Sequence, residues 1–370
     1  FQNRDKILQL LVSFPEFLSI DKVQSLDITD DVQLLDIAEK IKPFFEGKET
    51  EKNWTLRIKS IHRLQSLLRG NAIVEYRQLL AKVVHDLSGC IAKASQSLRT
   101  ILSSSGCQLC KELAFALGPK LDSSTIDAFV TPLLKLSCSR KTITHRKANL
   151  AMISLVLFTN SSNRMMTQIY SSFLEKNVQA RAYALIWAEF FLLRHAPNSS
   201  VMDSSLNYLS SIIGKAVSDP SPMVRQIARP AFWTLNEFFP KDGRMILSSL
   251  SHSTLKALDK SRYTAVNMIP SALSGCDTSH SRESSDSRSS GKLASFSDPE
   301  SSSSPLNPEF DTSDRKPLVT TILAVSALTK NDEPSEVHND NSLIKNENCT
   351  KNLIKQSQNL KGTPETVEVM

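Results

Sequence analysis

The sequence predicts an all-α fold: an α-solenoid of HEAT-like helix pairs, followed by a disordered tail. The first observation is a register that recurs in five helix-opening stretches. With Arg57, Ser104, Arg146, Arg181 and Arg225 taken as position zero, the residue ten places later is always apolar, namely Leu67, Ala114, Val156, Phe191 and Leu235. The zeros are 35 to 47 residues apart. Such a period is typical of two-helix repeats that stack into a solenoid.

The second observation is an uneven composition. Recurrent apolar runs between residues 31 and 265 provide one long helical core, whereas residues 271–304 are nearly half serine and the remainder is polar. Such a tail buries too little apolar surface to offset the entropy lost on ordering. We therefore divide the chain into an N-terminal linker or leading helix (1–30), a helical-repeat domain (31–265) and a Ser-rich disordered linker (266–370).

Caps and helix breakers place the elements in order. Asp30 and Asp31 can cap a helix that ends at Pro43. Asn53 caps the next helix, which Gly70 and Asn71 close. Further helices are predicted near 72–87, 89–98, 100–117, 124–136, 145–159, 164–174, 178–195, 202–217, 222–238 and 244–258. A compact helical bundle is the weaker alternative, because it does not predict a fixed register.

The net charge of +6 conceals a partition along the chain. Residues 52–265 carry 28 Lys and Arg against 12 Asp and Glu, a net charge of +16, while residues 1–51 and 266–370 each carry −5. A body this basic indicates an acidic partner: nucleic acid, an anionic membrane or an acidic protein surface. Solubility alone is the alternative explanation.

Several functional classes lack their signatures. No apolar run approaches the ~18 residues of a membrane span, and no nucleotide-binding, catalytic or cofactor motif occurs, so we expect no enzyme. Cys107 and Cys110 are the only closely spaced cysteines; without further ligands they favour core packing over metal or redox chemistry. A reducing, intracellular compartment is the default expectation. Because the chain begins at Phe1, we expect it to be a fragment.

A solenoid places the turns within its helix pairs along one edge, and we expect function there. The first of these turns ends at Trp54, which is either a core anchor or an exposed aromatic that contacts a partner. Basic residues recur in the following turns: Arg99 in the second, Arg140 and Lys141 in the third, Lys176 and Arg181 in the fourth, Arg225 and Arg229 in the fifth. This recurrence favours a binding edge, although Asp219 leaves open a structural ion pair with Arg225.

The same residues resemble a TOG domain of the CLASP family of microtubule-associated proteins. The resemblance rests on Asn53-Trp54-Thr-Leu-Arg57-Ile-Lys59, on the stretch 114–118, on Ser218-Asp219-Pro220-Ser-Pro-Met-Val224-Arg225, and on the stretch 236–240. It extends over residues 31–262 and includes all five repeats. It implies a TOG-type array whose intra-repeat turns bind αβ-tubulin and microtubules, with the tubulin-binding residues Trp54, Arg99, Arg140, Lys141, Lys176, Arg181, Arg225 and Arg229.

The resemblance also implies roles in stabilisation, rescue and spindle organisation, and a place in the cytoplasm, cytoskeleton, mitotic spindle and nucleus. Two features depart from the family. Ser104 occupies a slot that is basic in other repeats, and residues 103–106 make a poor helix start. In the tail, Asn267-Met268-Ile269-Pro270 is similar to the Ser/Thr-x-Ile-Pro motif that end-binding proteins recognise, but it lacks the hydroxyl residue.

Two other functions stay open at this point. A HEAT-repeat scaffold or transport adaptor would bind peptides or protein partners on its concave helical face rather than at the turns. Nucleic-acid binding would favour aromatic residues interleaved with the basic ones, and only Trp54 is available, because Trp187 and Trp233 are predicted to lie in the core.

Overall fold

The computed structural model describes residues 3–160, 163–196, 200–262, 270 and 273. All of them belong to one compact unit, Phe1–Ser326. Every regular element among the described residues is helical, which confirms the predicted all-α class. The predicted disordered tail lies outside the described residues, apart from residues 270 and 273. None of the described helices combines the length and the apolar character needed to cross a membrane.

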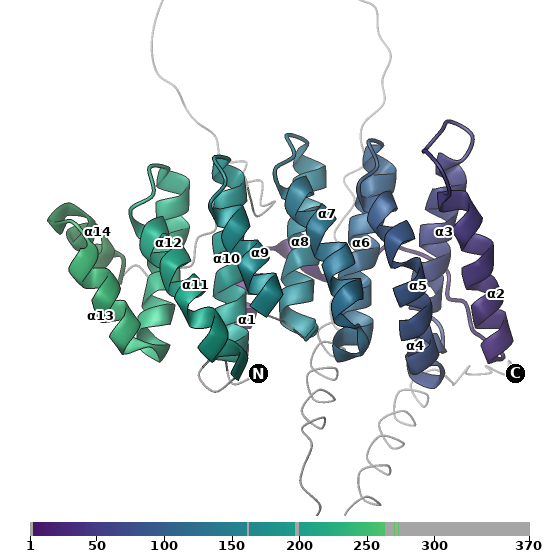
Figure 1. Cartoon of the computed structure of the whole chain (residues 1–370), viewed down its shortest axis with the longest axis horizontal. Coiled ribbons are helices and arrows are strands. Elements are labelled where there is room, and N and C mark those ends of the chain that lie inside the picture. Colours follow the sequence, from purple (N-terminus) through teal and green to yellow (C-terminus); the bar gives the residue numbers. More distant parts are fainter. Residues whose placement is uncertain (1–2, 161–162, 197–199, 263–269, 271–272, 274–370) are drawn as a thin grey trace, which may run out of the picture. The chain divides into compact units, whose positions relative to one another are not determined.

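In the described part of the chain, six pairs of helices follow one another, and the two helices of a pair run in opposite directions (Figure 1). The first helices are α2 (Asp31–Ile41), α5 (Arg77–Ser95), α7 (Ser123–Ser137), α9 (Asn163–Phe173), α11 (Ser200–Val217) and α13 (Pro240–Ser249). The second helices are α3 (Trp54–Leu67), α6 (Thr100–Leu117), α8 (Thr142–Phe158), α10 (Val178–His195), α12 (Pro222–Phe238) and α14 (His252–Arg262). Shorter elements are η2 (Lys42–Phe45), α4 (Ala72–Glu75) and η3 (Gly118–Lys120).

The helices stack in two layers. Each first helix contacts the first helix of the next pair, from α2 and α5 through to α11 and α13. The second helices do the same, from α3 and α6 through to α12 and α14. Each pair therefore packs against its neighbours in sequence, which is the arrangement of an α-solenoid. This confirms the predicted HEAT-like array.

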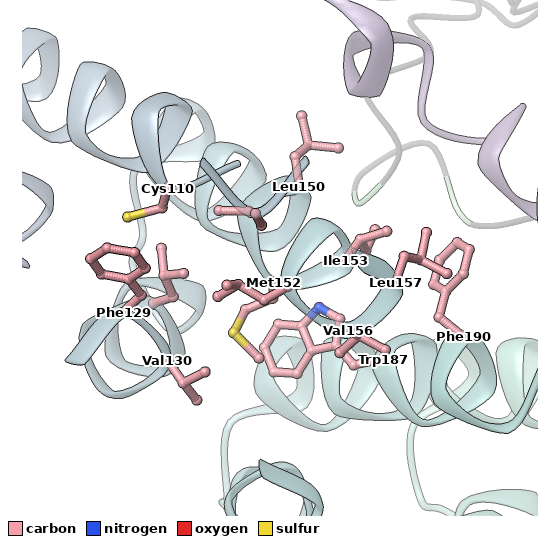
Figure 2. Packing of buried hydrophobic residues seen from close by; sticks show 14 of the residues in the cluster. Cys110, Phe129, Val130, Leu150, Met152, Ile153, Val156, Leu157, Trp187 and Phe190 are labelled. Atoms are coloured by element: carbon pink, nitrogen blue, oxygen red, sulfur yellow. The ribbon is translucent and has the colours of Figure 1, made fainter. Parts of the chain in front are cut away.

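The recurring register marks the buried side of the second helices. Position zero falls three or four residues after the first residue of α3, α6, α8, α10 and α12. The apolar residues ten places later, Leu67, Ala114, Val156, Phe191 and Leu235, are all fully buried. Figure 2 shows the core between α8 and α10, where Val156 lies beside Trp187. The Trp187 indole Nε1 donates to Asn149 Oδ1 at 2.8 Å, so its one polar group is satisfied in the core.

The closely spaced cysteines lie in the same core. Cys107 and Cys110 on α6 are free and fully buried, which confirms that they pack as small apolar side chains. Burial raises the pKa of the Cys110 thiol to about 12, so it stays protonated. No cluster of three or more His, Cys, Asp or Glu suited to a metal ion occurs in the described ranges.

Residues 3–28 form an N-terminal segment that lies on the layer of second helices. The segment contains α1 (Arg4–Leu11) and the 3₁₀ turn η1 (Pro15–Leu18), and it then continues without regular structure towards the start of α2. α1 contacts α10, and Phe14 packs on Phe190 with ring centroids 6.3 Å apart. At its other end, Ile28 bonds the side chain of Asn71, just after α3.

Some predicted boundaries differ from the structure. The predicted helices 72–87 and 89–98 are instead the short helix α4 and the long helix α5. The break between them lies at Tyr76 and not near Gly89, and the Tyr76 hydroxyl donates to the Thr29 carbonyl at 3.0 Å. Gly89 lies inside α5, where a Cβ would meet no atom within 4 Å. The predicted helix 244–258 is two helices, α13 and α14, which are separated at Leu250 and Ser251.

The predicted caps are partly confirmed. Asp30 caps α2 by accepting the Gln33 N–H at 2.7 Å. Asn53 does not cap α3: its Oδ1 accepts the Thr50 N–H at 2.8 Å, so its side chain stabilises the preceding loop instead. The predicted helix 100–117 is confirmed as α6, so residues 103–106, which make a poor helix start, lie inside the helix and do not begin it. A Cβ at Gly106 would lie 2.5 Å from the Ser95 backbone nitrogen, so glycine permits the close packing of α6 on α5.

Candidate functional site

The turns within the helix pairs lie along one edge of the array, the upper edge in Figure 1. From the first pair to the fifth they comprise residues 46–53, 96–99, 138–141, 174–177 and 218–221. We call these turns, together with the first helical turn that follows each, the turn edge. This arrangement confirms the expectation that the intra-repeat turns share an edge. Its chemistry depends on which side chains are engaged within the edge and which are free.

Three arginines at position zero of the register close their own turns. Arg57 donates to the carbonyl oxygens of Phe44 at 2.9 Å and Gly47 at 3.3 Å. Arg181 donates to the carbonyls of residues 175 and 176 at 3.2 and 2.8 Å, and Arg225 to those of residues 219 and 220 at 2.6 and 2.7 Å. Carbonyls in a turn have no helical partner, so a guanidinium that reaches them fixes the turn.

Other side chains tie each turn to the next. Arg181 forms a two-pronged ion pair with the buried carboxylate of Asp219, at 2.8 and 3.0 Å, and so joins the fourth turn to the fifth. Lys141 Nζ donates to the Leu98 carbonyl at 3.0 Å and joins the third turn to the second. Gln179 donates to the Ser137 and Ser139 carbonyls and joins the fourth to the third. The expected Asp219 ladder therefore exists, but its carboxylate pairs with Arg181, whereas Arg225 binds the Asp219 backbone.

Trp54 opens α3 and is half-buried. The guanidinium of Arg99, from the second turn, lies over its ring with the Arg99 Cζ 5.5 Å from the ring centroid. Arg99 also forms ion pairs with Glu49, at 2.7 Å, and with Glu51. Trp54 is therefore neither a fully buried core anchor nor a fully exposed aromatic, because Arg99 covers part of its ring by a cation–π contact; its contact with a partner stays a prediction.

A hollow lies between the first and second turns. Its volume is about 360 Å³, and it is open to solvent. Gly47, Glu49, Arg57, Lys93, Gln96, Ser97, Leu98 and Arg99 line it. The Lys93 ammonium closes one side by donating to the Phe45 carbonyl at 3.0 Å. The hollow can receive a side chain from a partner that lies across the first two turns.

Three of the predicted basic residues have uncommitted side chains. Among the residues that the structure describes, Arg140, Lys176 and Arg229 make no side-chain hydrogen bond or ion pair. Arg140 and Lys176 are exposed at the tips of the third and fourth turns. Arg229 is half-buried and lies seven residues after the start of α12, about 10 Å down the helix axis from the turn. It therefore lies below the turn edge and not in the fifth turn.

The turn edge also carries a row of exposed aliphatic residues that the charge pattern did not predict. Leu98 is 88% exposed, Ile101 65% and Ile143 58%, and Val178 is also exposed. The last three belong to a repeated pattern of a basic residue, Thr or Asn, and a β-branched residue: Arg99-Thr100-Ile101, Lys141-Thr142-Ile143 and Lys176-Asn177-Val178. This repeat was visible in the sequence. Such a row adds apolar contact area beside the basic residues, as expected for a protein–protein interface.

One face of the helical layers is already occupied. The N-terminal segment lies on the second helices, where Phe14 and Phe17 are buried. Lys111 of α6 donates to the carbonyls of Phe17 and Ser19 at 3.0 and 2.5 Å. A peptide partner on this face would have to displace the chain's own residues, whereas the turn edge is open.

Comparison with known families matches most of the helical array. A family model described as CLASP N terminal matches residues 34–259. Protein STU1 of Candida albicans is 34% identical over 244 residues, which cover 65% of this chain and 19% of that protein. Protein STU1 of Debaryomyces hansenii is 34% identical over 267 residues, which cover 70% and 17%. The chain thus spans less than a fifth of the length of these relatives.

A solved structure gives the same fold. A chain from the structure described as "Structural Basis of Microtubule Plus End Tracking by XMAP215, CLIP-170 and EB1" superposes with a TM-score of 0.51 at 20% sequence identity. The match covers 69% of this chain and 98% of that chain. The solenoid of helix pairs is therefore shared.

Proposed function

The chain belongs to the CLASP N-terminal family, and on this premise we propose that it binds αβ-tubulin through the turn edge and so regulates microtubule dynamics. The observation that carries the proposal is the turn edge itself, where Trp54, an aliphatic row and uncommitted basic residues face outward together. The structurally similar chain comes from work on microtubule plus-end tracking, which supports a role for this chain at microtubules. The proposal includes stabilisation and rescue of microtubules, spindle organisation and a place on the cytoskeleton, and it involves no catalytic step.

The eight predicted residues take different parts in this proposal. Trp54 and the aliphatic residues at 98, 101 and 143 supply the desolvated contact. Arg140 and Lys176 supply salt-sensitive contacts to an acidic surface. Arg99, Lys141, Arg181 and Arg225 are held by other residues of the edge, so they shape the surface and contribute charge at its margins. Arg229 would reach a partner only if that partner extends along α12.

Replacing Trp54 by Ala tests the proposal. Trp233 offers a matched control, because it too is half-buried and stacks with an arginine: the Arg262 Cζ lies 5.0 Å from its ring centroid, and Trp233 lies in α12 away from the turns. We expect Trp54→Ala to weaken binding to tubulin about 30-fold, the loss of a hot-spot residue, and Trp233→Ala to leave it unchanged. Gel filtration and co-sedimentation with tubulin and microtubules measure both.

The alternative function gives a different outcome. A scaffold that binds peptides on a helical face would keep its partner in the Trp54 variant and would not bind tubulin. The covered face of the second helices argues against this alternative. The end-binding motif expected at residues 267–270 lies outside the described residues except for Pro270, and it stays a prediction.

A further inference from the structure

The N-terminal segment crosses five second helices in turn. Starting at its N-terminus, Asn3 donates to the carbonyls of Leu193 and Ala196 at the end of α10, and Lys6 pairs with Glu237 of α12 at 2.5 Å. The remaining contacts follow the array backwards: Phe14 to Phe190 of α10, Glu16 to Lys147 of α8, Ser19 to Gln108 of α6, Asp21 to Gln65 of α3, and the Leu26 N–H to the Ser66 carbonyl of α3.

The middle of the segment is anchored by the buried amine of Lys111, whose pKa burial lowers to about 7. The Lys111 ammonium donates to the carbonyls of Glu16, Phe17 and Ser19 at 3.4, 3.0 and 2.5 Å. The Glu16 carbonyl also accepts the Ser19 N–H, whereas the carbonyls of Phe17 and Ser19 lie at the C-terminal end of η1, where the carbonyls of a short helix run out of backbone partners. Gln108 donates to the Ser19 carbonyl as well, at 3.0 Å. Lys111 and the segment therefore satisfy each other, and neither can leave without exposing buried polar groups.

The seat of the segment on α3 is shaped by a glycine. A Cβ added at Gly70 would lie 2.1 Å from the Leu26 carbonyl oxygen and 2.6 Å from its carbon. The backbone of the segment therefore approaches the end of α3 as closely as a glycine permits. Asn71 completes this seat by bonding both the N–H and the carbonyl of Ile28, at 2.7 and 2.9 Å.

We propose that the N-terminal segment is a brace that fixes the relative orientation of the helix pairs, and hence the spacing of the turns that bind the partner. In a solenoid each repeat contacts only its neighbours, so small rotations between repeats add up along the array. The brace is different, because it joins α3 to α10 and α12, which are several pairs apart. It lies outside the family match, which begins at residue 34, so the family assignment does not supply it.

The consequence concerns binding, and here the inference rests on the proposed function. A rigid partner that spans several turns is bound more tightly by an edge whose turns already have the right spacing, because less conformational entropy is lost on binding. The contacts that hold the brace lie on the bodies and lower ends of the second helices and not at the turn tips. Its residues are therefore positioning residues, and they need not touch the partner.

Two substitutions in the full chain unseat the brace from opposite sides. Phe14→Asp places a charge in a fully buried position of the segment, and Gly70→Ala blocks its seat at the end of α3. Val12→Asp is the matched control, because Val12 belongs to the same segment but is 78% exposed. Hydrogen exchange of the Leu26 amide, which bonds Ser66, reports whether the segment is seated. Circular dichroism reports whether the helices remain.

The decisive measurement is the distance between the first and fifth turns. Nitroxide labels on unnatural amino acids at the exposed positions Lys48 and Ser218 give this distance distribution by electron–electron double resonance. We expect a narrow distribution in the parent chain and in Val12→Asp, and a broad one when the segment is unseated. Tubulin affinity should then fall about tenfold at unchanged helicity.

The outcomes separate the two proposals. A released segment with an unchanged distance distribution would overturn the brace and leave the segment as a cover of the second helices only. If Phe14→Asp fails to fold, Gly70→Ala carries the test, since it alters the seat without entering the core. A broadened distribution in a chain that does not bind tubulin even before substitution would uphold the brace and reject the proposed partner.

Discussion

An arginine at the start of a second helix can either meet a partner or close the turn before it. At the turn edge, Arg57, Arg181 and Arg225 close their turns by donating to turn carbonyls. Arg140 lies within its turn, before the helix begins, and makes no such bond among the described residues. Residues of one type on one edge thus divide into those that build the surface and those that face outward.

This division predicts that the same substitution lowers stability at some of these arginines and leaves it unchanged at another. Arg181→Met removes the partner of the buried Asp219 carboxylate, so we expect the free energy of unfolding to fall by about 2–4 kcal/mol. Arg225→Met, which loses two charged hydrogen bonds at a half-buried site, should cost about 1–2 kcal/mol. Arg140→Met is the control and should unfold at the parent's denaturant concentration. Urea titration followed by circular dichroism measures all three; equal stability of Arg181→Met and Arg140→Met would contradict the assignment.

The sequence predicted where the arginines of the turn edge lie, but not which groups they bind. The register placed Arg181 and Arg225 at the turns because a helical period is carried by apolar residues that the sequence displays. The partners of these arginines were not predictable. A guanidinium can bond carbonyls of its own turn or a carboxylate of the next repeat, and the helical period does not determine which of these groups lies within reach. The exposed residues Ile101 and Ile143 were readable as part of a repeated triplet, but a search guided by charge passed over them.

Among the helices, α10 carries a buried acid in its middle. Glu189 is 1% exposed, and the Thr234 side chain is the polar group beside its carboxyl. Burial raises the pKa of Glu189 to about 8, so the folded protein holds it protonated at neutral pH. In the unfolded chain the same group ionises near its ordinary pKa of about 4.5.

These two pKa values determine whether the stability of the protein rises or falls with pH. Between about pH 4.5 and pH 8 the folded state binds a proton that the unfolded state releases, so Glu189 makes stability fall as pH rises. Glu189→Gln removes this titration and keeps the shape. We therefore expect the variant to be more stable than the parent by about 3 kcal/mol at pH 7 and to lose the advantage near pH 4.5. Thermal melts across this pH range measure the difference, and a constant difference would show that Glu189 does not titrate between these two values.

The sequence predicted helix boundaries correctly where a capping residue or an apolar stripe determines them, as at Asp30 and along α3. The predictions failed where tertiary contacts decided the boundaries. A glycine inside a helix costs about 1 kcal/mol relative to alanine. The packing of the long helix α5 outweighs this cost, so Gly89 does not interrupt the helix. The brace was predictable only in part: a leading helix was one of two expectations for residues 1–30, but the path of residues 12–28 comes from the surface on which they lie.

The charge of the whole array is distributed differently from what its net value implies. Residues 52–265 carry a net charge of +16, yet at the turn edge Arg99 is paired with Glu49 and Glu51, and Arg181 with Asp219. Much of the excess therefore lies on the bodies of the helices. Such charge steers an acidic partner from a distance and raises the association rate, whereas the few uncommitted cations at the edge act in the bound complex.

Charge reversal separates these two effects. We expect Arg140→Glu with Lys176→Glu to weaken tubulin binding at least tenfold and to reduce its dependence on salt between about 50 and 300 mM. The control reverses the exposed Lys82 of α5 and Lys241 at the start of α13, which changes the net charge equally away from the edge. It should slow association slightly and leave the dissociation rate unchanged. Stopped-flow or surface-based kinetics resolve the two rates; identical behaviour of both double variants would mean that only net charge matters.

The cross-links between turns also constrain how such a chain can change in length during evolution. Lys141, Gln179 and Arg181 each join a turn to its neighbour, and Arg99 joins the second turn to the first. One residue inserted in the third or fourth turn would disturb the connections on both of its sides. The connections between successive pairs, at the opposite edge, carry no such requirement from these bonds. We therefore expect related chains to accept insertions at that opposite edge, except after α3 where Gly70 and Asn71 hold the N-terminal segment, and to hold the lengths of their intra-repeat turns nearly constant.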